Sequence, residues 1–155
     1  TGVLIPSNRI APVTANGFAS LNALAPGRID FGVGTGFTGR RTMGLGAIKM
    51  SEMEEYIRVV MALLRRETVD FAIEGGRHKI EFLNPELELI NLVDPVALHI
   101  AAFGPRARRL TAKLGAGWIN FVGDVASGVA GLKGMQADWA QANRPAADQI
   151  GRAHV

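Results

Sequence analysis

The hydrophobic positions along the chain follow two alternating patterns, one typical of helices and one typical of buried strands. Apolar residues recur at helical spacing over four segments, 12–24, 51–66, 104–114 and 125–142. The segments 29–33, 96–102 and 117–121 are short and almost continuously apolar, as parallel strands buried on both faces are. Residues 2–5 have the pattern of a further strand end. Strand and helix therefore alternate four times, which predicts a parallel sheet with helical crossovers.

Two local patterns refine this prediction. Ser51 and Glu54 have the spacing of a capping box, so we expect the second helix to begin at Ser51. Two alternating segments on either side of Gly75-Gly76 predict a small β-hairpin before the next strand. A glycine-rich loop is expected over 34–46. A closed (β/α)8 barrel has eight such units in ~250 residues, so the chain is predicted to be a partial α/β barrel of about four units with a hairpin insertion.

Composition and charge exclude several classes of protein. The 155 residues contain no Cys, which rules out disulfides and thiolate metal sites. No apolar run approaches the ~18 residues of a membrane span, and no His or carboxylate pair has metal-ligand spacing. The net charge of +3 comes from arginines at turns and helix ends without interleaved aromatic residues, so we expect no nucleic-acid binding. A cytoplasmic location is expected.

Candidate chemistry lies at three strand ends, where parallel α/β folds bind their ligands. Gly34-Thr35-Gly36 follows one strand and offers free backbone N–H groups. Phe103-Gly104-Pro105 follows another and begins a helix, whose N-terminus favours anions. Asn120 ends the last strand with an amide that can donate and accept hydrogen bonds.

Five motifs in this order resemble the luciferase-like monooxygenase family, over residues 1 to about 121. The first is Arg9-Ile10-Ala11-Pro12, which follows Thr1-Gly2-Val3. The second combines Leu24-Ala25-Pro26-Gly27-Arg28 with Gly32-Val33-Gly34-Thr35-Gly36. The others are Arg41-Thr42-Met43-Gly44-Leu45, Ala101-Ala102-Phe103-Gly104-Pro105 and Gly115-Ala116-Gly117-Trp118-Ile119. The resemblance implies a (β/α)8 barrel that binds FMN or coenzyme F-420 at its carboxyl end.

The resemblance also implies roles for individual residues. Gly2-Val3 matches a bulge, often with a cis peptide bond, that supports the flavin ring, and Ile5 lines the same cofactor. Gly34-Thr35-Gly36 flanks the ring. Phe103, Gly104 and Arg106 match a loop that contacts the phosphate-bearing tail. Arg41 and Asn120 are candidates for holding substrate or phosphate, although a loop salt bridge is an equal alternative for Arg41.

Some positions depart from the family pattern. Phe37 stands where many deazaflavin enzymes carry an acidic residue, and Gly34 where luciferase has a reactive Cys. Phe121 and Asp124 replace the Thr and Lys that hold phosphate in the sugar-phosphate dehydrogenases. We therefore expect neither of these two activities, and the catalytic residues are not identified. We expect His99, Trp118 and Phe103 to be packing residues.

The resemblance predicts an oxidoreductase that uses reduced flavin or deazaflavin for hydride transfer or monooxygenation of a small organic substrate. Two alternatives are a cofactor-free structural protein on the same scaffold and another phosphate-binding barrel such as a sugar isomerase. The first would lack the ring-facing glycines, and the second would carry Lys or carboxylate residues at several strand ends.

The ends of the chain suggest a fragment. The string Ile150-Gly151-Arg152-Ala153-His154-Val155 resembles the translation of a common sequencing adapter, and the chain does not begin with Met. We therefore expect a partial barrel over 1–148 and a non-native tail over 149–155. The full-length parent is expected to be a homo-oligomer. Residues 1–148 alone are expected to expose apolar surface, to associate, and to bind cofactor weakly.

Overall fold

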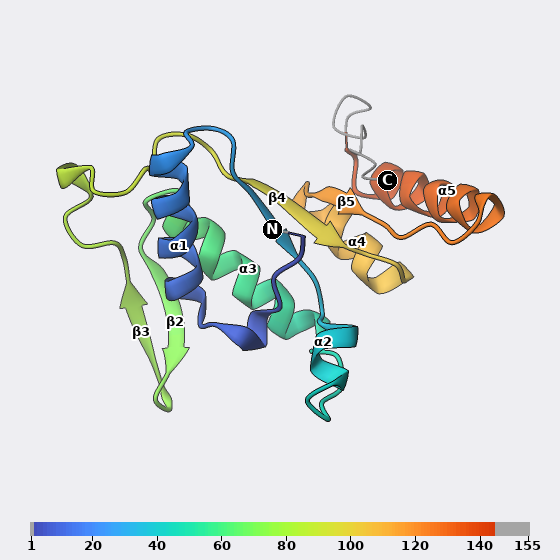
Figure 1. Cartoon of the computed structure of the whole chain (residues 1–155), viewed down its shortest axis with the longest axis horizontal. Coiled ribbons are helices and arrows are strands. Elements are labelled where there is room, and N and C mark those ends of the chain that lie inside the picture. Colours follow the sequence, from blue (N-terminus) through green and yellow to red (C-terminus); the bar gives the residue numbers. More distant parts are fainter. Residues whose placement is uncertain (1, 145–155) are drawn as a thin grey trace.

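A parallel sheet of three strands lies at the centre of the computed structural model, which describes residues 2–144 (Figure 1). Its order is β1 (Asp30–Val33), β4 (Ala97–Ala101) and β5 (Gly117–Ile119), and both neighbouring pairs are parallel. Leu4 adds a parallel bridge to Val33. The strand expected over 2–5 is thus a single bridge beside β1. All carboxyl ends lie at the same edge of the sheet, as predicted.

Helices connect the strands in the predicted alternation, and a hairpin interrupts it between the second helix and β4. Figure 1 shows this hairpin and α5 at opposite ends of the molecule, with the sheet between them. The remaining elements are η1 (Pro6–Asn8), α1 (Ala11–Leu24), α2 (Phe37–Arg41), α3 (Met50–Leu64), β2 (Val69–Ile73), β3 (Gly76–Ile80), η2 (Pro85–Leu87), α4 (Pro105–Leu114) and α5 (Val125–Gln141). Residues 145–148 and the predicted non-native tail lie outside the described residues.

Two local predictions are wrong. Helix α3 begins at Met50 with Lys49 at its N-cap, and no side chain caps it. Met50 packs against the core, and the Glu54 carboxylate pairs with Lys113 of α4 at 2.5 Å instead of reaching back to the backbone. Tertiary contacts therefore override the expected capping box. The expected glycine-rich loop contains the short helix α2, which begins after Gly36.

The main core lies between the sheet and the helices α1 and α3. Met53 and Ile57 of α3 belong to the same buried cluster as Phe31 and Val33 of β1. The ring of Phe18, on α1, lies 4.9 Å from that of Phe31. Each large apolar side chain buried in this way contributes about 1.5–3 kcal/mol. Helix α3 therefore packs against β1, the strand that precedes it.

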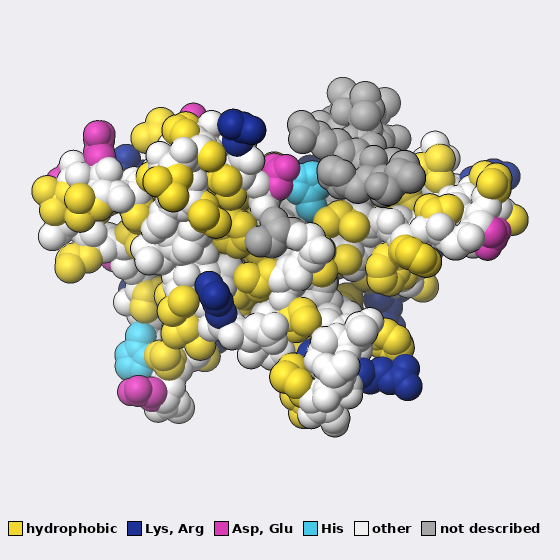
Figure 2. All heavy atoms as spheres, viewed as in Figure 1, with side chains coloured by type: hydrophobic (Ala, Val, Ile, Leu, Met, Phe, Trp, Pro, Cys, Tyr) yellow, Lys and Arg dark blue, Asp and Glu magenta, His cyan; other side chains and the backbone are white. Residues whose placement is uncertain are grey.

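Helix α1 also carries an apolar face that other described residues leave uncovered. Ile10, Val13, Leu21 and Leu24 are all at least 47% exposed. Figure 2 shows hydrophobic side chains gathered over α1 and over the loop that carries η2. Among residues 2–144, no helix combines the length and hydrophobicity needed to cross a membrane.

A buried asparagine joins the loops that precede β1 and β4. The Asn22 side chain is fully buried, donates to the Asp94 carbonyl at 2.8 Å and accepts from the Gly27 N–H at 3.1 Å. Asn91 donates to the Asn22 carbonyl and to the Asp94 carboxylate. Because Gly27 and Asp94 lie just before neighbouring strands, this network aligns the amino ends of β1 and β4.

Helix α5 is attached to α4 by a small second core and an ion pair. Met135 and Trp139 pack with Ala112, and the Trp118 and Trp139 rings meet edge to face at 6.4 Å. Arg108 Nε lies 3.1 Å from Asp138 Oδ2, and both side chains are at least four-fifths buried. The expectation that Trp118 is a packing residue is confirmed.

The contact between α1 and α3 predicts a pH effect on stability. The Tyr56 hydroxyl shares a 2.5 Å hydrogen bond with Thr14, and burial raises the pKa of Tyr56 above its ordinary value. Folding thus favours the neutral phenol, and this stability is present below the pKa of unfolded tyrosine and is lost as the pH rises through the folded pKa. We expect Tyr56→Phe to reduce the fall in unfolding free energy above about pH 10. Urea unfolding of the original chain and of the variant between pH 8 and 11 measures this difference. The same dependence of unfolding free energy on pH in both proteins would contradict the assignment.

Candidate functional site

The two faces of the sheet carry different side chains. Phe31, Val33 and Ile100 are fully buried beneath the helices. Strand alternation then places the residues between them on the opposite face. The registers align those residues in rows across β1, β4 and β5: Gly32, His99 and Gly117 in one row, with Ala101 and Ile119 in the next row toward the carboxyl edge. This face is lined mainly by small residues.

At the carboxyl edge, Val3 and Ala101 pack closely against Gly34, which is buried. A Cβ atom built on Gly34 would lie 3.1 Å from Val3 Cγ2 and 3.3 Å from Ala101 Cβ. The Gly34 N–H donates to the Leu4 carbonyl at 3.0 Å, and the Leu4 N–H donates to the Gly32 carbonyl at 2.8 Å. The surface formed by Val3, Gly34 and Ala101 is called the Gly34 platform below. Sequence reasoning identified Val3 and Gly34 but missed Ala101, which only the register with β1 brings in.

The N-terminal segment fits beside this platform in the way that the family resemblance implies. The Gly2–Val3 peptide bond is cis. Ile5 lies against the turn that begins α2, since Cβ atoms on Gly36 and Gly39 would lie 2.5 Å and 2.8 Å from its side chain. Gly36 has φ 75°, a conformation that favours glycine. Ile5 therefore supports the loop that follows β1, next to Thr35, whose carbonyl accepts from the Ile48 N–H.

The loop after β4 begins α4 and carries the predicted phosphate contact. Gly104 is the N-cap of α4, and Arg106 lies in its first turn with an exposed side chain. Arg106 forms no ion pair or hydrogen bond with the rest of the described chain. Arg108 is occupied by Asp138 and by the Phe103 carbonyl, at 3.3 Å. Arg106 is thus free to meet an anion that approaches the positive end of α4.

Arg41 and Asn120, the candidates for holding substrate or phosphate, have different surroundings. The Arg41 guanidinium lies over the Phe37 ring, 5.4 Å from its centroid, and both residues are exposed. The loop salt bridge considered for Arg41 is not formed with any described residue. Asn120 lies against α5, where a Cβ on Gly131 would be 3.1 Å from its amide nitrogen. Asn120 is therefore turned toward the helix layer, away from the Gly34 platform.

His99 is a packed residue, as expected, whereas Phe103 is not. His99 lies on the sheet face opposite the main core, with Nε2 3.8 Å from Asp30 Oδ1 and 21% of its side chain exposed. A Cβ on Gly117 would fall 2.2 Å from its Nδ1, so the ring occupies the space that this glycine leaves. Phe103 is 62% exposed. The expectation for Phe103 is wrong because an apolar run does not show which of its residues other elements cover.

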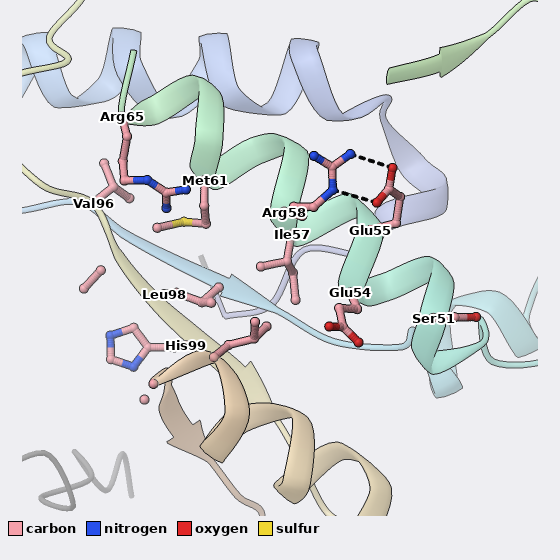
Figure 3. A pocket seen from close by; sticks show the side chains of 14 residues that line it. Ser51, Glu54, Glu55, Ile57, Arg58, Met61, Arg65, Val96, Leu98 and His99 are labelled. Atoms are coloured by element: carbon pink, nitrogen blue, oxygen red, sulfur yellow. Dashed lines mark hydrogen bonds and ion pairs between the residues drawn. The ribbon is translucent and has the colours of Figure 1, made fainter. Parts of the chain in front are cut away.

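A groove of about 800 Å³ lies elsewhere, between α3, α4 and the amino half of β4 (Figure 3). Ile57, Met61 and Leu98 provide its apolar wall, and none of the predicted site residues lines it. The charged side chains at its rim are held in ion pairs: Arg58 with Glu55, as Figure 3 shows, Glu54 with Lys113, and Arg65 with Glu67. The carboxyl edge, with its unpaired arginine and the closely packed Gly34 platform, is the better candidate site. No three His, Asp or Glu side chains within residues 2–144 gather to hold a metal ion.

Comparison with known proteins identifies the family. The family model described as luciferase-like monooxygenase matches residues 1–152. The chain belongs to this family. An F-420-dependent glucose-6-phosphate dehydrogenase of Beutenbergia cavernae is 35% identical over 127 residues, 77% of this chain and 36% of the relative. An F-420-dependent hydroxymycolic acid dehydrogenase of Mycobacterium tuberculosis is 33% identical over 132 residues, 81% and 35% of the two chains.

A solved structure of a luciferase-like protein confirms the fold. The coenzyme F-420-dependent tetrahydromethanopterin reductase of Methanopyrus kandleri matches 99% of this chain and 48% of its own with a TM-score of 0.79 at 15% identity. The predicted partial (β/α)8 barrel is confirmed by this match. The chain spans between about a third and a half of the length of these luciferase-like proteins.

Asp124, which departs from the family pattern, has a structural role. Asp124 is the N-cap of α5, and its carboxylate accepts from the Ser127 N–H at 2.9 Å. This hydrogen bond lowers the pKa of Asp124, so the side chain is anionic at neutral pH. In this luciferase-like chain the loop after β5 therefore carries a negative charge in place of the phosphate-holding lysine that the resemblance would suggest.

Proposed function

We propose that this chain is the cofactor-binding part of an oxidoreductase that passes a hydride between coenzyme F-420 and a small organic substrate. The observation that carries the proposal is the close packing at the Gly34 platform, where Val3 and Ala101 would already crowd one added methyl group. Gly34 itself is buried, so a planar ring would rest on the partly exposed Val3 side chain, whose close approach to the strand end depends on the missing Cβ. When bound, the deazaflavin would supply the redox chemistry, and the protein would supply its position and surroundings.

The other residues of the edge would hold the tail of the cofactor. The backbone of Gly104 and the Arg106 guanidinium lie at the N-terminus of α4, which is ten residues long. Backbone N–H groups and the helix dipole favour a phosphate there, and an arginine adds charge-assisted hydrogen bonds. The platform and the phosphate contact thus lie on neighbouring strand ends.

FMN with monooxygenation is the second candidate, because FMN has the same kind of ring and phosphate-bearing tail. The family model carries the description of a monooxygenase. Both curated relatives named above are F-420-dependent dehydrogenases, which supports F-420 as the first choice. We therefore place F-420 and hydride transfer ahead of FMN.

Titration of the 15N-labelled chain with oxidised F-420 and, separately, with FMN tests the proposal by NMR. We expect saturable shifts of the amides of Val3, Gly34, Ala101 and Gly104, at lower concentrations of F-420 than of FMN. Stronger binding of FMN would reverse the order of the two cofactors. Shifts confined to the groove between α3 and α4, or no saturable shifts, would contradict the proposed site.

Arg106→Ala is expected to weaken cofactor binding by about 1–2 kcal/mol, the contribution of one charge-assisted hydrogen bond. This corresponds to an increase of roughly 5- to 30-fold in the dissociation constant. Arg109→Ala is the matched control, because Arg109 is also exposed on α4 and its removal changes the net charge equally. Equal effects of the two substitutions would assign the change to net charge and would remove Arg106 from the site.

A further inference from the structure

Three phenylalanines at the carboxyl edge are exposed, each following a different strand of the sheet. Phe37, Phe103 and Phe121 follow β1, β4 and β5 and are 62%, 62% and 80% exposed. The chain has seven phenylalanines, and the other four are buried in the core or packed against it: Phe18, Phe31, Phe71 and Phe82. The three exposed residues are called the phenylalanine rim below.

The neighbours of the rim residues show which way two of them face. Ala102 is fully buried, and its carbonyl accepts from Trp118 Nε1 at 2.8 Å. Asn120 lies against α5. Because successive residues of an extended chain point to opposite faces, Phe103 and Phe121 turn away from the helices, toward the face that carries Ala101 of the Gly34 platform.

Pairing continues between the ends of β4 and β5, which keeps their loops adjacent. The Ala102 N–H donates to the Ile119 carbonyl at 3.0 Å. Neighbouring strands lie about 4.8 Å apart, so Phe103 and Phe121 leave the sheet from adjacent positions. Phe103 and Phe121 therefore border the platform on the face that carries Ala101, and Phe37 begins α2 at the β1 end of the same edge.

The charges around the rim disfavour an anion at its β5 end. Asp124 lies three residues after Phe121 and is held in place as the N-cap of α5. The Arg41 guanidinium, which lies over Phe37, is at the other end of the rim, after β1. An anionic group beside Phe121 would face the Asp124 carboxylate without a described cation from the same loop to offset it.

We infer that the phenylalanine rim binds the apolar body of an uncharged aromatic or alicyclic substrate next to the cofactor. This inference rests on the proposed function and adds the substrate class. Aromatic side chains gain their largest contact energy from apolar partners, and ligands of parallel α/β folds bind at this edge. A sugar phosphate would place hydroxyl groups on the rings and negative charge near Asp124.

The test uses the whole 155-residue chain labelled with 4-fluorophenylalanine, so that each phenylalanine gives one 19F resonance. Cyclohexanol and glucose 6-phosphate are titrated separately, with and without saturating F-420. We expect cyclohexanol to shift the resonances of Phe37, Phe103 and Phe121 saturably and to leave the four core resonances in place. Phe121→Ser is expected to raise the dissociation constant about fivefold, whereas Val129→Ser, which removes an exposed apolar side chain from α5, leaves it unchanged.

Three results would overturn the inference. Glucose 6-phosphate could shift the rim resonances at lower concentrations than cyclohexanol does, or cyclohexanol could leave the rim resonances unmoved. Shifts of the rim with protein concentration alone would show that a second copy of the chain covers it. The chemical shift of the Gly34 amide, recorded during F-420 addition, distinguishes failure of the substrate inference from failure of the proposed function. Cofactor binding without rim binding refutes only the substrate class, and an unmoved Gly34 amide refutes the proposed function.

Discussion

Gly34→Val is expected to weaken cofactor binding more than any other single substitution at the carboxyl edge. A Cβ atom at this position already lies 3.1 Å from Val3 and 3.3 Å from Ala101, and two further methyl groups would project over the platform. Overpacking of this kind costs about 1–3 kcal/mol. Because the added methyl groups displace Val3 from the position on which the ring would rest, we expect a similar loss in binding free energy, or roughly 5- to 150-fold in the dissociation constant. Titration of both proteins with F-420, followed by the fluorescence of the cofactor, measures the loss.

Gly123→Ala is the control for this substitution. Gly123 lies in the loop after β5 at the same end of the sheet, and a Cβ atom there meets nothing within 4 Å. The Gly123→Ala variant should bind F-420 with the same affinity as the unmodified chain. A far-ultraviolet circular dichroism melt of each variant checks that the sheet is intact. Unchanged affinity in a folded Gly34→Val protein would remove the platform from the cofactor site.

Asn22→Leu is expected to cause the largest loss of stability among polar substitutions. The change removes the fully buried side chain that now pairs with the Gly27 N–H and the Asp94 carbonyl. Each unsatisfied group costs about 1–3 kcal/mol, so we expect the unfolding free energy to fall by about 3 kcal/mol. For a domain of this size that corresponds to a decrease of roughly 6–12 °C in melting temperature.

Asn16→Leu provides the comparison, because Asn16 is an exposed asparagine on the same helix. Its melting temperature should change little, since surface substitutions are usually within about 0.5 kcal/mol. Asn91→Ala should reproduce part of the effect, and the double variant should lose less than the sum of the single losses, because the two side chains share one network. Additive losses would show that Asn22 and Asn91 act independently.

Several features of the fold were predictable because they depend on residues close together in the sequence. Pro12 and Pro105 mark helix starts, where a missing N–H costs nothing, and α1 and α4 begin within one residue of them. Gly75-Gly76 marks the hairpin turn, which joins β2 to β3. The apolar runs over 29–33 and 96–102 gave β1 and β4. Local patterns also placed Gly34 and Gly104 at strand ends.

The errors arose where distant parts of the chain compete with a local signal. The capping box at Ser51 gave way to the packing of Met50 and to the pairing of Glu54 with Lys113, which lies 59 residues away. Asn120 was expected at the ligand-binding edge, but α5 draws it to the other face.

The order of the elements, the parallel sheet, the family and the candidate strand ends could be read from the sequence. These follow from periodicity, proline and glycine positions, and motifs within short stretches of chain. The tertiary structure alone decided that Val3, Gly34 and Ala101 form one surface and that Asn22 joins the loops before β1 and β4. The physical reason is register: a shift of one residue between strands exchanges the two faces of a sheet, and contacts across tens of residues set it.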